Sequence, residues 1–177
     1  MALVTRTGAD ELTGDEVSPS SSWRNRVWRY APLGLWIAFI YFASTGAMSA
    51  SNTSRIIGPL FRWLFPDITE AQLLFVHFSV RKSAHFTEYA VLALLAARAF
   101  ITSTRSFLHR RWFVAALALV VTVALLDEYN QSFLLSRTGT IWDSMIDISG
   151  GITALVVFSL WRARRRRRRK ESAAGEN

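Results

Sequence analysis

Long apolar stretches alternate with short polar ones along this chain, and the pattern predicts a helical membrane protein. Four stretches are each close to the roughly 20 residues that a helix needs to cross about 30 Å of hydrocarbon. They run from about Tyr30 to Met48, Ser83 to Ile101, Trp112 to Leu126 and Ile141 to Trp161. We expect an all-α polytopic bundle of about four transmembrane helices, with the third extending through Tyr129.

A shorter apolar segment lies between the first two spans. From Arg55 to Phe65, bulky apolar residues recur at helical spacing, with Arg62 and Trp63 among them. The segment is too short to cross a membrane, and Pro66 follows it. We therefore expect a short amphipathic helix that lies in the membrane interface.

Three regions follow from this pattern. Residues 1–22 are polar and rich in Gly, Ser, Thr and acidic residues, with no periodicity, so they are expected to form a disordered cytoplasmic tail. Residues 23–161 form the membrane domain. Residues 162–177 form a basic cytoplasmic tail.

The formal net charge of +8 comes from one run of basic residues. This run consists of Arg162, Arg164 to Arg169 and Lys170. A basic run directly after an apolar helix is typical of a cytoplasmic flank that contacts anionic lipid headgroups. Neither interleaved aromatic residues nor a nucleic-acid-binding motif accompanies it, so we expect membrane lipids, and no nucleic acid, as partners. Cysteine is absent from the chain, which excludes disulfides and thiolate metal sites.

The basic residues also predict an orientation. With four spans, three basic groups fall on one side of the membrane: Arg24, Arg26 and Arg29, then Arg105, Arg110 and Arg111, then the run after Trp161. Short loops rich in Lys and Arg stay in the cytoplasm. We therefore expect a multi-pass plasma-membrane protein with both termini in the cytoplasm.

This topology gathers ionisable and polar residues at the outer ends of three spans. They are Arg81, Lys82, His85, Glu88 and Tyr89 in the second, Asp127, Glu128 and Gln131 in the third, and Arg137, Asp143 and Asp147 at the fourth. A charge at mid-membrane costs about 2.5–3.5 kcal/mol, so these groups need partners or a wet cavity. The helical face through Asp143 and Asp147 continues into Gly150 and Gly151, where small residues would let another helix approach closely.

The order and spacing of these residues resemble the VanZ-like family of bacterial membrane proteins, named for a teicoplanin-resistance determinant. The matching motifs are Arg81-Lys82-Ser83-Ala84-His85-Phe86-Thr87-Glu88-Tyr89, Asp127-Glu128-Tyr129-Asn130-Gln131, and Arg137-Thr138-Gly139-Thr140 with Asp143 and Gly150 following. The resemblance covers about Trp36 to Phe158. This chain has Asp147 where the family often has Asn. The resemblance implies a bacterial cell-envelope role that touches glycopeptide susceptibility, and it supplies no agreed reaction.

Our leading hypothesis is an accessory membrane protein that binds an envelope ligand at the outer polar residues. The ligand would be a cell-wall precursor, a lipid headgroup or a glycopeptide-like molecule. Arg81, Lys82 and Arg137 suit an anionic group. The remaining predicted ligand-binding residues are Glu88, Tyr89, Gln131, Asp143 and Asp147.

The alternative is a membrane-embedded enzyme acting on a lipid-linked or cell-wall substrate. His85 would then work with Asp127 or Glu128 as acid and base. The sequence leaves open whether a reaction is catalysed, and Ser83, Ser132 and Ser136 are candidate nucleophiles by proximity alone.

Metal binding is the other chemistry that these residues suggest. The acidic residues and His85 suit a divalent cation, but no spacing such as H-E-x-x-H is present. We therefore favour structural ion pairing and predict neither a metal site nor a cofactor.

Overall fold

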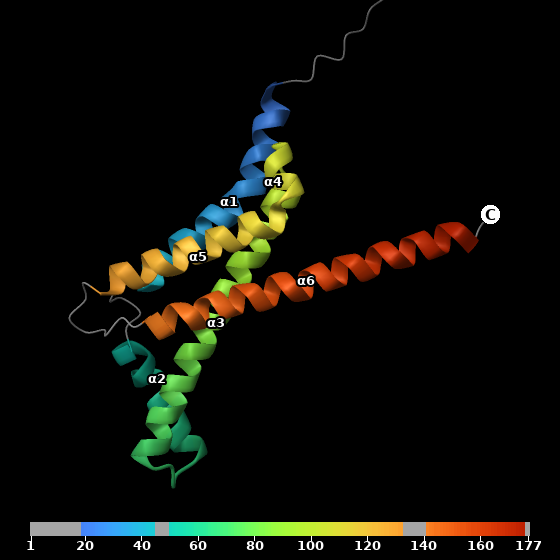
Figure 1. Cartoon of the computed structure of the whole chain (residues 1–177). Coiled ribbons are helices and arrows are strands. Elements are labelled where there is room, and N and C mark those ends of the chain that lie inside the picture. Colours follow the sequence, from blue (N-terminus) through green and yellow to red (C-terminus); the bar gives the residue numbers. More distant parts are fainter. Residues whose placement is uncertain (1–18, 45–49, 133–140, 176–177) are drawn as a thin grey trace, which may run out of the picture.

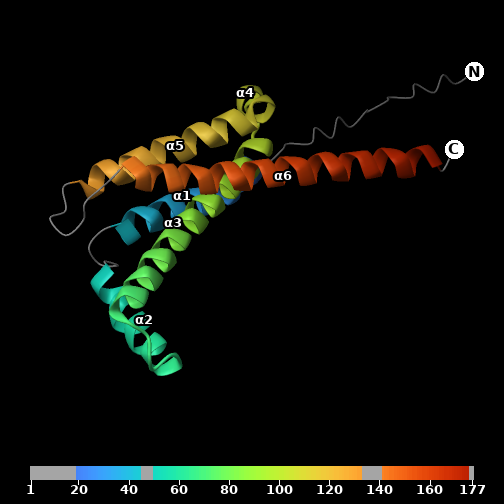
Figure 2. The same ribbon diagram turned by 60° about the horizontal axis from the view of Figure 1, so that its bottom comes forward.

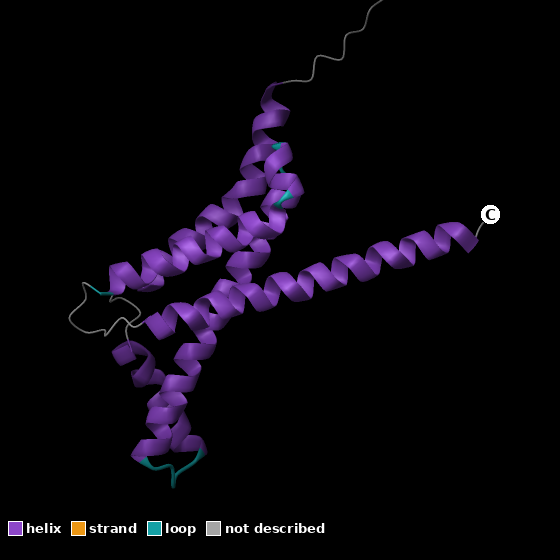
Figure 3. Cartoon of the chain, viewed as in Figure 1, coloured by secondary structure: helices purple, strands orange, loops and turns teal. Residues whose placement is uncertain are grey.

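The computed structural model describes residues 19–44, 50–132 and 141–175, and within these ranges the regular elements are all helices (Figure 3). They are α1 Pro19–Ser44, α2 Ala50–Leu64, α3 Glu70–Ile101, α4 Ser106–Arg110, α5 Trp112–Gln131 and α6 Ile141–Gly175. The predicted all-α class is confirmed. Residues 1–18 of the predicted disordered tail lie outside the described residues, and residues 19–22 already belong to α1.

Three helices in the described part of the chain are long and apolar enough to cross a membrane: α3, α5 and residues 142–174 of α6. The chain is therefore a multi-pass membrane protein. Helix α1 covers the predicted first span as far as Ser44, and residues 45–48 lie outside the described part. Tyr, Trp and Pro residues lower the mean hydropathy of α1, so its role as a fourth span stays a prediction.

Two helices are longer than the sequence predicts. Helix α3 begins at Glu70, well before Ser83, because Thr69 and Gln72 form a capping box at its start. Helix α6 continues past Trp161 to Gly175, because arginine is a good helix former. The predicted limits are those of membrane spans, and neither the capped start of α3 nor the basic end of α6 belongs to the apolar stretch on which each span was based.

Helix α2 bears out the short helix predicted around Arg55 to Phe65. It packs against the first half of α3, and the two form a hairpin that projects from the bundle (Figures 1 and 2). An exposed ion pair, with Arg62 Nη2 2.6 Å from Glu70 Oε1, joins the two helices. The position of α2 in the membrane interface remains a prediction.

Helix α3 is the centre of the fold, since it contacts each of the other five helices. Helix α6 crosses it, and the last turns of α6 extend well beyond the bundle (Figures 1 and 2). Small residues of α3 occupy the core: Ala93, Ala96 and Ala97 are fully buried beside Leu92. Small side chains allow close helix packing in a membrane, where lipid is as apolar as the core.

Two consecutive glycines let α6 pack against α3 and α5 together. A Cβ atom at Gly150 would lie 2.2 Å from the backbone oxygen of Phe86 in α3. A Cβ atom at Gly151 would lie 2.6 Å from Cγ1 of Val120 in α5. The close helix approach predicted at these glycines is confirmed.

Candidate functional site

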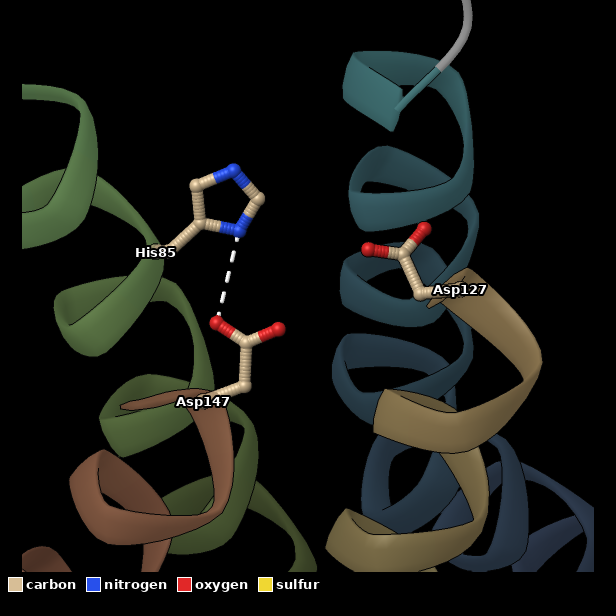
Figure 4. A group of neighbouring side chains, drawn as sticks. All are labelled: His85, Asp127 and Asp147. Carbon is tan, nitrogen blue, oxygen red and sulfur yellow. Dashed lines mark ion pairs between the residues drawn. The ribbon is translucent and has the colours of Figure 1, made fainter. Parts of the chain in front are cut away.

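Three helices bring His85, Asp127 and Asp147 together, and we call these residues the triad. His85 comes from α3, Asp127 from α5 and Asp147 from α6 (Figure 4). One nitrogen or oxygen atom from each lies within 4.8 Å of the other two. The closest approach is an ion-pair contact of 3.4 Å between His85 Nδ1 and Asp147 Oδ1. His85 and Asp147, which are 62 positions apart in the sequence, thus meet at one place with Asp127.

Both carboxylates of the triad are almost completely buried. Asp127 and Asp147 are each 3% exposed. Oδ1 of Asp127, Oδ1 of Asp147 and Nδ1 of His85 have no hydrogen-bond partner within the described residues. Buried polar atoms are nearly always hydrogen-bonded, and here the 3.4 Å ion-pair contact is the interaction that His85 Nδ1 and Asp147 Oδ1 make in place of a hydrogen bond. This group of atoms therefore calls for a functional explanation.

The other oxygen of Asp127 is held by an amide. Gln131 Nε2, one turn further along α5, donates hydrogen bonds to Asp127 Oδ2 at 2.9 Å and to Ser44 Oγ at 3.4 Å. Gln131 and Ser44 are both buried. The end of α1 is thereby tied to the triad, so four helices contribute to the site.

One helical turn before the triad, a second polar contact joins α3 to α6. Lys82 Nζ forms an ion pair with Asp143 Oδ1, and both side chains are largely buried. The ammonium also lies 5.3 Å from the centre of the Phe78 ring. Lys82 thus neutralises Asp143. Together with the triad and Gln131, this pair makes up what we call the polar cluster.

The remaining predicted site residues surround the polar cluster or lie outside the described residues. Tyr89 is fully buried one turn beyond His85, whereas Arg81, Glu88 and Glu128 are half-buried. The backbone carbonyl of Glu88 accepts a 2.9 Å hydrogen bond from the indole of Trp36 in α1. Arg137 falls within residues 133–140, which are not described.

Two buried serines near the polar cluster were missed by sequence reasoning. Ser44 touches Gln131, and Ser144 lies between Asp143 and Asp147 with its Oγ buried and no hydrogen-bond partner in the described ranges. The position of Ser44 at the predicted outer end of the first span was the available signal. Ser144 is three residues before Asp147, and this spacing places the two on one helix face.

An aromatic cluster marks the opposite end of the same helices. Trp112 of α5 packs edge-on against Phe158 of α6, with ring centres 5.8 Å apart, and Arg162 lies over the Trp112 ring at 5.9 Å. Asp127 is about 15 residues along α5 from Trp112, or about 22 Å at 1.5 Å per residue. The polar cluster and the aromatic cluster are therefore separated by most of a membrane's hydrocarbon thickness.

The family model described as VanZ/LLP1 matches residues 29–162, which include every member of the polar cluster. The chain belongs to the VanZ/LLP1 family. This confirms the resemblance drawn from the motifs around His85, Asp127 and Asp143. No curated protein and no solved structure matches the chain of this VanZ/LLP1 protein.

Proposed function

We propose that this VanZ/LLP1 protein binds an envelope ligand at its polar cluster and thereby alters susceptibility to glycopeptides such as teicoplanin. The observation that carries the proposal is the triad: three ionisable side chains from three helices, with buried atoms that lack hydrogen-bond partners in the described structure. A polar ligand that forms hydrogen bonds with these atoms would bind favourably, because it supplies the partners that they lack.

The position of the polar cluster along the helices supports an extracytoplasmic ligand. Tryptophan and arginine residues favour membrane interfaces, and basic flanks favour the cytoplasmic side. Trp112, Trp161 and the arginine run lie together at one end of the bundle, with Arg165 at 4.8 Å from the Trp161 ring centre. If this end faces the cytoplasm of a bacterial plasma membrane, with both termini inside, the polar cluster faces the outer leaflet.

The chemistry of the cluster suits a ligand that combines an anionic group with hydrogen-bond donors. The ammonium of Lys82 can leave its ion pair with Asp143 and bind a phosphate or carboxylate of the ligand instead. Arg81 is half-buried nearby on α3. The triad carboxylates accept hydrogen bonds from hydroxyl, amide or ammonium groups. Lipid-linked cell-wall precursors and glycopeptides carry both kinds of group. Arg137 remains a predicted contributor.

Teicoplanin tolerance of cells expressing the chain tests this proposal. The His85→Ala variant is expected to lose the tolerance that the parent confers. The substitution removes the imidazole that contacts Asp147 and so disrupts the triad. His77→Ala is the matched control, since His77 lies on the same helix outside the polar cluster. With equal amounts of protein in the membrane, unchanged tolerance in His85→Ala cells would contradict the proposal.

One observation favours an enzyme as the second candidate function. A carboxylate beside an imidazole is the arrangement that orients histidine for proton transfer, and Asp147 lies 3.4 Å from His85. Asp147 is thus a more direct partner for His85 than the predicted Asp127 or Glu128. Ser83 and Ser132 are exposed, whereas Ser144 is buried near the triad.

Incubating the purified protein with a lipid-linked cell-wall precursor distinguishes an enzyme from a binding protein. An enzyme is expected to convert a lipid-linked cell-wall precursor in detergent or vesicles, and Asp147→Asn is expected to slow the reaction strongly. A binding protein retains the precursor unchanged after long incubation, as measured by mass spectrometry of the extracted lipid.

A further inference from the structure

The geometry points to a divalent-cation site formed by His85, Asp127 and Asp147. The three side chains come from different helices and point into one shared space (Figure 4). They offer one imidazole nitrogen and two carboxylate oxygens, a ligand set that zinc accepts. This site uses the triad of the proposed function, but it is argued from the geometry of the ligand atoms and requires no envelope ligand.

The spacing of the ligand atoms fits a small cation. Around a tetrahedral zinc ion with bonds of about 2.0–2.2 Å, ligand atoms lie about 3.3–3.6 Å apart. His85 Nδ1 and Asp147 Oδ1 are already 3.4 Å apart. All three candidate ligand atoms are within 4.8 Å of one another, so Asp127 needs only a small side-chain movement to complete the set.

Charge balance gives an independent reason. Asp127 and Asp147 place two carboxylates close together inside a membrane bundle, and each is only 3% exposed. The nearest ammonium, on Lys82, is taken up by Asp143. A divalent cation bound between the two carboxylates would balance both of their charges.

The buried triad atoms without a hydrogen bond in the described part of the chain are those that a cation needs, and two of them already face each other in the His85–Asp147 ion-pair contact. His85 Nδ1, Asp127 Oδ1 and Asp147 Oδ1 all lack hydrogen bonds within the described residues, while Asp127 Oδ2 is bound by Gln131. In metal sites, such outer hydrogen bonds orient the ligating carboxylate and leave its other oxygen for the metal. Gln131 therefore acts as a positioning residue for Asp127.

A mixed nitrogen and oxygen ligand set favours Zn²⁺ among the common divalent cations. Imidazole suits zinc and disfavours Mg²⁺ and Ca²⁺, which prefer all-oxygen sites. Three protein ligands also leave a fourth position, which in catalytic zinc sites holds water or substrate. An anionic envelope ligand bound by the polar cluster would fit there.

Zinc binding to the full chain, purified in detergent through a tag without histidine, tests the site. The parent is expected to bind one equivalent of Zn²⁺ and to unfold at a higher temperature when zinc is present. Asp147→Asn is expected to lower the zinc affinity at least about 10-fold and to lose the zinc-dependent shift in Tm. His77→Ala and Glu70→Gln, which remove an imidazole and a carboxylate elsewhere on α3, are expected to behave like the parent.

The same measurements overturn the inference if the parent binds no stoichiometric zinc, or if the control variants lose as much affinity as Asp147→Asn. The Asn variant keeps the shape of the side chain, and its Tm without zinc shows whether it is folded. If it is unfolded, Asp127→Asn replaces it, with the same expected loss of zinc affinity. Zinc binding is measured on the protein alone, so a protein that binds no zinc overturns the cation site while the loss of tolerance in His85→Ala cells still tests the envelope ligand.

Discussion

Gly150 sets the distance between α6 and the backbone of α3, and so fixes where Asp147 meets His85. Asp147 lies three residues before Gly150, which places both on the same side of α6. The first atom that a side chain at Gly150 would meet is a backbone oxygen, which cannot move aside as a flexible side chain can. Any substitution there must push the two helices apart.

Gly150→Ala is therefore expected to destabilise the bundle by about 1–3 kcal/mol, the usual cost of overpacking a core. Gly34→Ala is the matched control, because nothing lies within 4 Å of the added Cβ. It should be neutral or stabilising by up to about 1 kcal/mol, since alanine favours helix over glycine. Thermal unfolding of both variants in detergent measures the difference, and equal Tm values would contradict the close packing.

Single residues also show which parts of the site sequence can predict. His85, Asp127 and Asp147 stand out because a charge in an apolar helix is costly and needs a reason. Ser44 and Ser144 do not stand out, because hydroxyl groups in helices usually bond to their own backbone. Thr122 and Thr153 do so here, at 2.8 Å each. Only three-dimensional packing distinguishes a serine that faces another helix.

At the scale of elements, the additional turns at the start of α3 form one arm of the α2–α3 hairpin and carry exposed apolar side chains such as Leu74, Phe75 and Phe78. Thr69 Oγ1 accepts a hydrogen bond from the backbone N–H of Gln72, and Gln72 Oε1 accepts one from the backbone N–H of Thr69. This reciprocal pair supports a helical start that is not covered by the rest of the bundle. The sequence pattern placed the start of this helix at Ser83 and overlooked residues 70–82, because the cap depends on single residues and Arg81 and Lys82 interrupt the apolar pattern.

Thr69→Ala is expected to weaken the first turns of α3 by about 0.5–2 kcal/mol, the usual cost of losing an N-cap. Amide hydrogen exchange at residues 70–73 should become faster, while exchange near Tyr89 stays unchanged. Thr122→Ala provides the comparison, because its hydroxyl bonds only to the carbonyl of Ala118 within α5. If exchange at the start of α3 is the same in both variants, the cap does not stabilise this end.

At the scale of the whole molecule, the sequence predicted the helical bundle and the meeting of distant polar segments. It did so because the cost of placing charges in lipid restricts where these residues go. The number of crossing helices was harder to predict. Helix α1 contacts α3 and α5 along the bundle, yet its hydropathy falls below that of α3, α5 and α6. Its aromatic residues suit either a span or an interface.

Cysteine labelling from each side of the membrane measures this topology, because the natural chain has no cysteine to interfere. If α1 crosses, a single cysteine at Ser136 is expected to react with an impermeant reagent from outside. A cysteine at Ser172, near the end of α6, is expected to react only after the cells are opened. Labelling of Ser136 from the cytoplasm would place the polar cluster on the inner side and contradict the proposed orientation.

The central position of α3 also bears on how the protein is assembled during synthesis. His85 and Asp127 are synthesised before Asp147. Until α6 is inserted, these two polar side chains lack the helix that covers them in the complete bundle and face lipid. A truncated chain that stops before residue 141 would keep those groups exposed to lipid. Such a chain is expected to be less stable in the membrane, because each polar group lacks the helix that covers it in the complete bundle.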